Sequence, residues 1–108
     1  MVIRFHTRML QTIGNDDKAA RKKLGKRSAD VLRKRLDDLR ASDNLETMRH
    51  LPGRCHELKG DRAGQFAVDL EHPKRLVFQP LDGVPRVDGG FDWSTITTIE
   101  IVEIVDYH

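Results

Sequence analysis

The side chains in this sequence that could do chemistry are mostly cations, and they are unevenly spread along the chain. Residues 1–40 carry 12 Lys or Arg against 5 Asp or Glu, and residues 41–80 carry 6 of each. Residues 81–108 carry one Arg against 6 acidic residues, so a net charge of +2 hides regional charges of +7, 0 and −5. This asymmetry predicts either a basic surface for nucleic-acid phosphates or two regions that attract each other.

The histidines and the cysteine form no recognisable metal or nucleophile motif. His6, His50, His56 and His72 lack the short spacings that are typical of metal ligands. Cys55 is the only cysteine, so it has no second thiol for a disulfide or a zinc cluster. A lone cysteine is more often a small buried hydrophobe than a nucleophile. The sequence therefore predicts no metal site.

Length and composition predict one globular domain, residues 1–108. A chain of this size, with 38% hydrophobic and 33% charged residues, can form one modest core. No segment approaches the roughly 18 apolar residues that span a bilayer. The opening residues, Met1 to His6, lack the basic and apolar regions of a secretory signal. We therefore expect a cytoplasmic protein that does not associate with membranes.

Two helices and an opening strand are predicted in the first half of the chain. Val2–Phe5 is a short apolar strand. Asn15 and Asp16 can cap a helix over Lys18–Leu24, which Gly25 ends. A second helix, capped by Ser28, extends to about Arg40 and carries an apolar stripe of Val31, Leu32, Leu36 and Leu39. The stretch from Ser42 to Leu51 could add another helical turn.

After Pro52 the hydrophobic pattern changes from the helical period to the period of strands. Strands are predicted at Cys55–Leu58, Gln65–Leu70, Arg75–Gln79 and Ile99–Val105, and residues 59–64 and 80–90 are rich in turn formers. The predicted fold is α+β: a mostly antiparallel sheet of four or five strands with the helical hairpin of residues 16–40 on one face.

Four short motifs then point to one family. The chain has a leucine–lysine–glycine turn at 58–60, a glycine closely followed by an aromatic at 64–66, an arginine at the start of the next strand, and a terminal Asp-Tyr-His. With these motifs the chain resembles the HigB branch of the RelE/ParE toxin superfamily, over residues 51–78 and 99–108. The resemblance implies a RelE-like fold, in which an opening strand and a helical hairpin pack on one face of a curved sheet.

The resemblance also implies a function. Such proteins are toxins of type II toxin–antitoxin systems, and this branch cleaves messenger RNA on the ribosome. The 2′-hydroxyl of the cleaved nucleotide attacks the adjacent phosphate, without metal or cofactor. The implied partners are the ribosome, messenger RNA and a HigA-like helix-turn-helix antitoxin, with operator DNA bound only through that antitoxin.

The family's catalytic residues carry over to Lys59, Arg75, Tyr107 and His108. Lys59 and Arg75 would stabilise charge on the phosphate oxygens. His108 would protonate the leaving 5′-oxygen, because its unperturbed pKa is near neutrality. Tyr107 would stack on a base and orient the phosphate. Further RNA contacts are expected from Arg62, Lys74, Lys22, Lys23, Lys26 and Arg27.

The chain departs from the family pattern at three places. Glu71 and His72 stand where members often have another basic residue, and Lys74 replaces a usual tryptophan. Residues 84–98, which include Trp93, are more numerous than in compact members.

Ordinary structural interpretations stay open beside the functional ones. Arg75 could pair with Asp69 or Glu71, the cations of the 59–64 turn and of the helical hairpin could simply be solvated, and the last two residues could be a frayed tail. Two other functions also stay open: a ParE-like toxin that acts on DNA gyrase, which has no need of the terminal His, and a non-catalytic binding relative.

Overall fold

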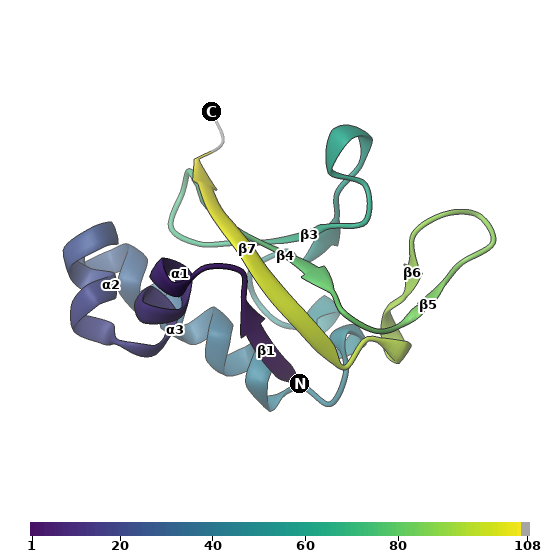
Figure 1. Cartoon of the computed structure of the whole chain (residues 1–108), viewed down its shortest axis with the longest axis horizontal. Helices are drawn as coiled ribbons and strands as arrows, with labels where there is room; N and C mark the ends of the chain where they lie inside the picture. The colour runs from purple at the N-terminus through teal and green to yellow at the C-terminus, as the bar shows by residue number, and fades with distance from the viewer. Residues whose placement is uncertain (107–108) are drawn as a thin grey trace.

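Five strands form one sheet in the computed structural model, which describes residues 1–106 (Figure 1). The elements are β1 (Val2–Phe5), α1 (Arg8–Asn15), α2 (Asp17–Leu24), α3 (Lys26–Ala41), β2 (His56–Glu57), β3 (Phe66–Asp69), β4 (Lys74–Pro80), β5 (Val84–Pro85), β6 (Phe91–Asp92) and β7 (Thr98–Asp106). Short 3-10 helices occupy Leu45–His50, Gly60–Arg62 and Trp93–Thr95. Helices α1 and α3 pack against the five-stranded sheet, and α2 packs on these two helices (Figure 1).

The sheet has the order β1-β7-β4-β3-β2, so that the last strand lies between the first strand and β4. β1 runs parallel to β7, and the other neighbouring pairs are antiparallel. The predicted α+β class and mostly antiparallel sheet are therefore confirmed. Opposite β4, the register places Ile101 against Phe78 and Glu103 against Val77. Val102 is thus an extra residue of β7, and a bulge of this kind bends its strand.

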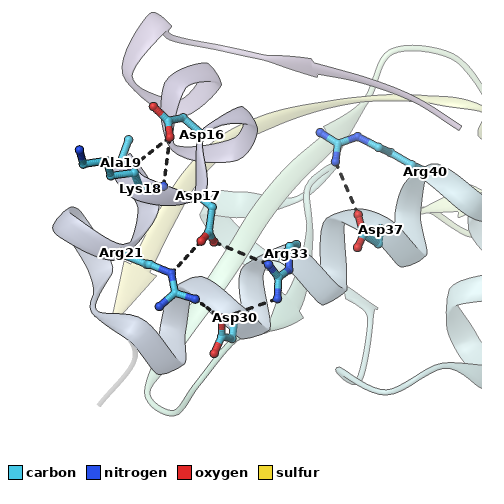
Figure 2. A network of polar contacts seen from close by, with 9 residues as sticks. All are labelled: Asp16, Asp17, Lys18, Ala19, Arg21, Asp30, Arg33, Asp37 and Arg40. Carbon is cyan, nitrogen blue, oxygen red and sulfur yellow. Dashed lines mark hydrogen bonds and ion pairs between the residues drawn. The ribbon is translucent and has the colours of Figure 1, made fainter.

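The predicted helical hairpin is present as α2 and α3. The Asp16 carboxylate accepts hydrogen bonds from the backbone N–H groups of Lys18 and Ala19, at 3.0 and 3.4 Å, and so caps α2 (Figure 2). Gly25, at a φ of 86°, ends α2 as predicted and directly precedes α3. Ser28 was the wrong cap, because α3 begins two residues earlier at Lys26 and encloses Ser28 as a buried residue.

The helix α1 was not predicted. Its eight residues bury only Ile13, and they include the weak helix formers Thr12 and Gly14. Thr7 begins it, because the Thr7 side chain accepts a hydrogen bond from the backbone N–H of Leu10 at 3.1 Å. The Phe5 ring packs so closely over Gly14 that a Cβ there would lie 2.5 Å from Phe5 Cε1.

The core lies between the helices and the sheet. The predicted stripe of α3 contributes Leu32, Leu36 and Leu39, which are buried, and Val31, which is half-buried. From the sheet come Leu76, Phe78, Ile99 and Ile101, each at most 1% exposed. Cys55 packs against this core, and burial raises the pKa of its thiol to about 12, which opposes a nucleophilic role. Within residues 1–106, no helix has the length and apolar character needed to cross a membrane.

The segment after β4 forms a hairpin, β5 and β6, that projects from the end of the sheet (Figure 1). Trp93, just after β6, anchors this segment in the core at an exposure of 5%. Its ring lies edge-on to Phe66, with ring centroids 5.2 Å apart, and the Arg49 guanidinium covers it at 3.6 Å. The Glu57 carboxylate accepts hydrogen bonds from the Trp93 indole at 2.8 Å and from the Phe91 backbone at 3.1 Å.

Replacing Glu57 by Ala should therefore destabilise the protein. The change leaves a buried indole N–H and a backbone N–H without their acceptor, which costs about 1–3 kcal/mol of unfolding free energy. Urea unfolding followed by Trp93 fluorescence measures this loss, because Trp93 is the only tryptophan. Asp43→Ala, at an exposed residue, is the matched control. Equal unfolding midpoints for Glu57→Ala and Asp43→Ala would contradict the anchoring role.

Candidate nucleic-acid interface on the open face of the sheet

The face of the sheet opposite the helices carries a band of polar side chains. Side chains alternate between the faces of a strand, so the core residues Leu76 and Ile104 leave Arg75 and Val77 on the other face. The register then aligns Asp69, Arg75 and Val105 in one row across β3, β4 and β7. The next row contains Ala67, Val77 and Glu103. We call this surface the open face.

Arg75 lies in the first of these rows, next to a carboxylate. Its Nε is 3.2 Å from Asp69 Oδ1, and both side chains are largely covered, at 26% and 22% exposed. Arg75 is therefore a strand residue paired with Asp69, and its catalytic role stays a prediction. A pocket of 380 Å³ beside this pair is lined by Arg54, Asp69, Leu70, His72, Pro73, Lys74 and Arg75. We call it the Arg75 pocket, and it also contains the predicted RNA contact Lys74.

The end of β7 lies against the start of β4. Val105 is opposite Arg75, and Asp106 is opposite Lys74. The next residues of the sequence, Tyr107 and His108, lie outside the described residues, so their predicted roles stay predictions. The chain nevertheless arrives at them directly beside the Arg75 pocket.

Lys59 is not brought next to Arg75. It is an exposed residue of the turn between β2 and β3. That turn begins where Leu58 donates to the carbonyl of Gln65 at 2.8 Å, which is the end of β3 farthest from Asp69. Asp69 follows Gln65 by four steps along an extended strand, a span of about 13 Å. Lys59 and Arg75 therefore lie at opposite ends of the open face.

Arg62, a predicted RNA contact in the same turn, is engaged within the protein. Its guanidinium forms an ion pair with Glu103 of β7 and donates to Gln65 Oε1 at 2.9 Å. Because β4 lies between β3 and β7, the Arg62 side chain must cross the open face to reach Glu103. Ala67 and Val77, in the same row as Glu103, face away from the helices and are still fully buried.

The predicted RNA contacts of the helical layer lie at the corner between α2 and α3. All four are exposed, and none forms an ion pair with another residue in the range 1–106; they are Lys22, Lys23, Lys26 and Arg27. We call them the helical corner. It belongs to the layer on the other side of the sheet from the open face.

Other cations of the first forty residues are paired locally. Arg21 bridges Asp17 and Asp30, at 2.7 and 3.4 Å, and Arg33 approaches the same two carboxylates (Figure 2). Arg40 lies near Asp37 at the other end of the network. These side chains are 32–66% exposed, so the pairs contribute little to stability. Exposed cations without an ion pair in the described range 1–106 therefore include the helical corner and also Arg4, Arg8, Lys18 and Lys34.

Acidic residues near the C-terminus mainly shape turns. The Asp82 carboxylate accepts hydrogen bonds from the backbone N–H groups of Thr97 and Thr98, at 2.9 and 3.1 Å. Although burial raises the pKa of Asp82, these hydrogen bonds and one from the Thr97 hydroxyl lower the pKa overall. Asp92 accepts from Ser94 in the same way, which also lowers its pKa. The negative charge of this region is thus used within the fold.

Sequence reasoning missed Arg54 as a residue of the pocket. Its Nε lies 2.6 Å from Asp69 Oδ2, so that Asp69 contacts two guanidinium groups. The only signal in the sequence was the turn-forming pair Pro52-Gly53, which could not predict where the Arg54 side chain points. Among residues 1–106, the His, Cys, Asp and Glu side chains form no group of three that could hold a metal ion.

Comparison with known proteins gives similarity only in structure. No family model and no curated protein sequence matches the chain. A YoeB/ParE toxin from Agrobacterium tumefaciens superimposes with a TM-score of 0.61 at 12% identity, covering 100% of both chains. The YoeB dimer from Staphylococcus aureus gives 0.56 at 19% identity, covering 100% of this chain and 97% of that chain. At such low identity the likeness concerns the fold, and this chain has the fold of the YoeB/ParE toxins.

Proposed function

We propose that this protein is the toxin of a type II toxin–antitoxin pair and that it cleaves messenger RNA on the ribosome. The observation that carries the proposal is the position of Arg75. It lies in a pocket on the open face, directly beside the strand that leads to Tyr107 and His108, in a fold shared with known toxins.

The proposed reaction is an attack of the 2′-hydroxyl on the adjacent phosphate. A bond forms between the 2′-oxygen and phosphorus, the bond between phosphorus and the 5′-oxygen breaks, and the proton of the 2′-hydroxyl passes to solvent water. Arg75 would stabilise the negative charge that builds up on the phosphate oxygens. His108 would give a proton to the departing 5′-oxygen, and Tyr107 would stack on a base and orient the phosphate. The reaction as proposed needs no metal or cofactor.

The positions of the other cations assign them to different parts of the RNA. Lys74 lines the Arg75 pocket and would contact the same phosphate as Arg75. Lys59, at the far end of the open face, would contact a neighbouring phosphate instead of the one that is cleaved. The helical corner lies on the other layer, so we assign it to ribosomal RNA, where exposed lysines bind phosphates without reading sequence.

The proposed protein partner is a HigA-like antitoxin with a helix-turn-helix DNA-binding domain. It would cover the toxin or keep it off the ribosome, and operator DNA would be bound only through it. This partnership is supported by the fold, because the similar solved structures are described as toxins.

One competing target follows from the comparison. The Agrobacterium tumefaciens protein is described as a YoeB/ParE toxin, and the ParE branch of the superfamily that this chain resembles acts on DNA gyrase. A gyrase-directed toxin would use the same fold as a protein-binding surface and would have no need of a proton donor at His108.

Expression of this gene alone should slow the growth of a bacterial host. A toxin that cuts translated messages removes the templates of protein synthesis, and co-expression with the gene encoded beside it should restore growth. The measurement is a growth curve after brief induction, with an Arg75→Ala variant as the control. Normal growth with the parent protein at full expression would contradict the toxin function.

Deleting His108 should remove most of the RNA cleavage and leave the fold intact. A general acid typically contributes about 10²- to 10⁴-fold in rate, whereas a terminal residue contributes little to a core. Arg75→Ala should be similarly damaging, and Arg62→Ala should be milder. Cleavage of a translated message on purified ribosomes, by primer extension, measures the loss, and circular dichroism confirms folding.

Two outcomes would decide against this assignment. A folded protein without His108 that cuts as fast as the parent would show that His108 is not the proton donor. If neither form cuts RNA while both arrest growth, the gyrase-directed alternative takes the place of the ribonuclease.

A further inference from the structure

We propose that Arg54 and Arg75 form a two-guanidinium receptor for a single RNA phosphodiester, and that Asp69 is the positioning residue that holds them. The inference rests on the proposed function in taking RNA as the substrate. It adds to that function a phosphate-binding residue, Arg54, and a reason for the acidic residue in a basic pocket.

The geometry of the pair centres on the Asp69 carboxylate. Arg54 Nε lies 2.6 Å from Oδ2, and Arg75 Nε lies 3.2 Å from Oδ1. One carboxylate therefore holds two guanidinium groups from different elements, the loop before β2 and the start of β4. Both arginines line the same 380 Å³ pocket.

The backbone beneath this carboxylate is fixed from three sides. The Asp69 N–H donates to the carbonyl of Gly53 at 2.7 Å, which ties the loop to the end of β3. Arg35 of α3 donates through Nε to the Asp69 carbonyl, also at 2.7 Å. Asp69 is in turn paired in register with Arg75 on β4. The site is therefore built on the fold and not on a free loop, as a preorganised binding site requires.

Arg54 has an unusual backbone for its residue type. Its φ is 51°, in the left-handed region that non-glycine residues seldom occupy. This backbone presents an exposed guanidinium, oriented by Asp69, beside the pocket where a phosphate can reach it.

The charges of the pocket suit a phosphodiester. Arg54, Arg75 and Lys74 bring three cationic side chains to the pocket lining, and Asp69 brings one carboxylate. Asp69 engages Arg54 through Nε, and a guanidinium carries four further N–H donors on its terminal nitrogens, which match two phosphate oxygens in a bidentate contact. A phosphodiester can therefore bind at the terminal nitrogens of Arg54 while Nε stays on Asp69.

The test is binding of an RNA that cannot be cut. The probe is a hexanucleotide with 2′-O-methyl groups, titrated against the full-length protein at several salt concentrations. Arg54→Gly is the main variant, since glycine accepts the left-handed backbone and the fold is kept. Arg54→Lys retains the positive charge but lacks the planar guanidinium that can contact two phosphate oxygens at once. Arg86→Ala is the matched control, because Arg86 is an exposed arginine on the projecting hairpin, paired with Asp88.

We expect Arg54→Gly to weaken binding roughly 5- to 10-fold and to lower the salt slope by about 0.7, as for one lost contact to a single strand. Arg54→Lys should lie between this variant and the parent, and Arg86→Ala should bind like the parent. Asp69→Asn should also weaken binding and shift the Nε–Hε NMR signals of both arginines before RNA is added. Inorganic phosphate should displace the probe, whereas N-acetylglutamate amide should not.

The receptor would be wrong if Arg54→Gly bound the probe like the parent, or if Arg86→Ala lost as much affinity. Tighter binding by Asp69→Asn would show that Asp69 competes with RNA and does not position the arginines. Displacement by the carboxylate compound as readily as by phosphate would point to an acidic protein partner. Cleavage of a message on ribosomes is measured separately. If the parent protein binds the probe in an Arg54-dependent way but cuts no message, the phosphate receptor is supported and the ribonuclease function is rejected.

Discussion

Asp69 is the residue through which the layers of this molecule meet at the candidate site. Its backbone carbonyl accepts from Arg35 of the helical layer, and its N–H donates to the loop at Gly53. Its carboxylate contacts Arg54 and Arg75. Asp69 Oδ1 is buried and accepts no hydrogen bond within the described residues, so the positive charges of Arg54 and Arg75 offset the cost of covering this largely buried carboxylate. The Arg75 pocket is the space left beside this convergence.

The order of the strands determines which residues lie together on the rest of the open face. β7 lies between β1 and β4, and its end therefore lies against the start of β4, where Arg75 is. The turn after β2 is held at the other end by Arg62, which crosses to Glu103. The open face thus has one ion-pair cluster at each end of β3: Arg62 with Glu103 at one end, and Asp69 with Arg54 and Arg75 at the other. RNA on this face would lie between Lys59 and Arg75, with the helical corner available for a different contact.

The sequence predicted those features that depend on local chemistry. Asp16 and Gly25 bounded a helix because capping and a left-handed backbone act within a few residues, and the strand-like hydrophobic period after Pro52 located β3, β4 and β7. It did not predict α1, whose weak helix formers are held by contacts with β1. The family motifs led to Arg75, but they could not place Lys59 relative to it. Arg54 was missed because its direction depends on a backbone angle and on Asp69, fifteen residues away.

The measurement that tests the account most directly is the chemistry of the cut ends. A message translated on purified ribosomes is exposed to the protein, and the termini at each cut are identified by end-labelling and mass spectrometry. Attack by the 2′-hydroxyl predicts a 2′,3′-cyclic phosphate on the upstream fragment and a 5′-hydroxyl on the downstream one. A 3′-hydroxyl with a 5′-phosphate, or an uncut message at full occupancy of the ribosome, would contradict the proposed mechanism.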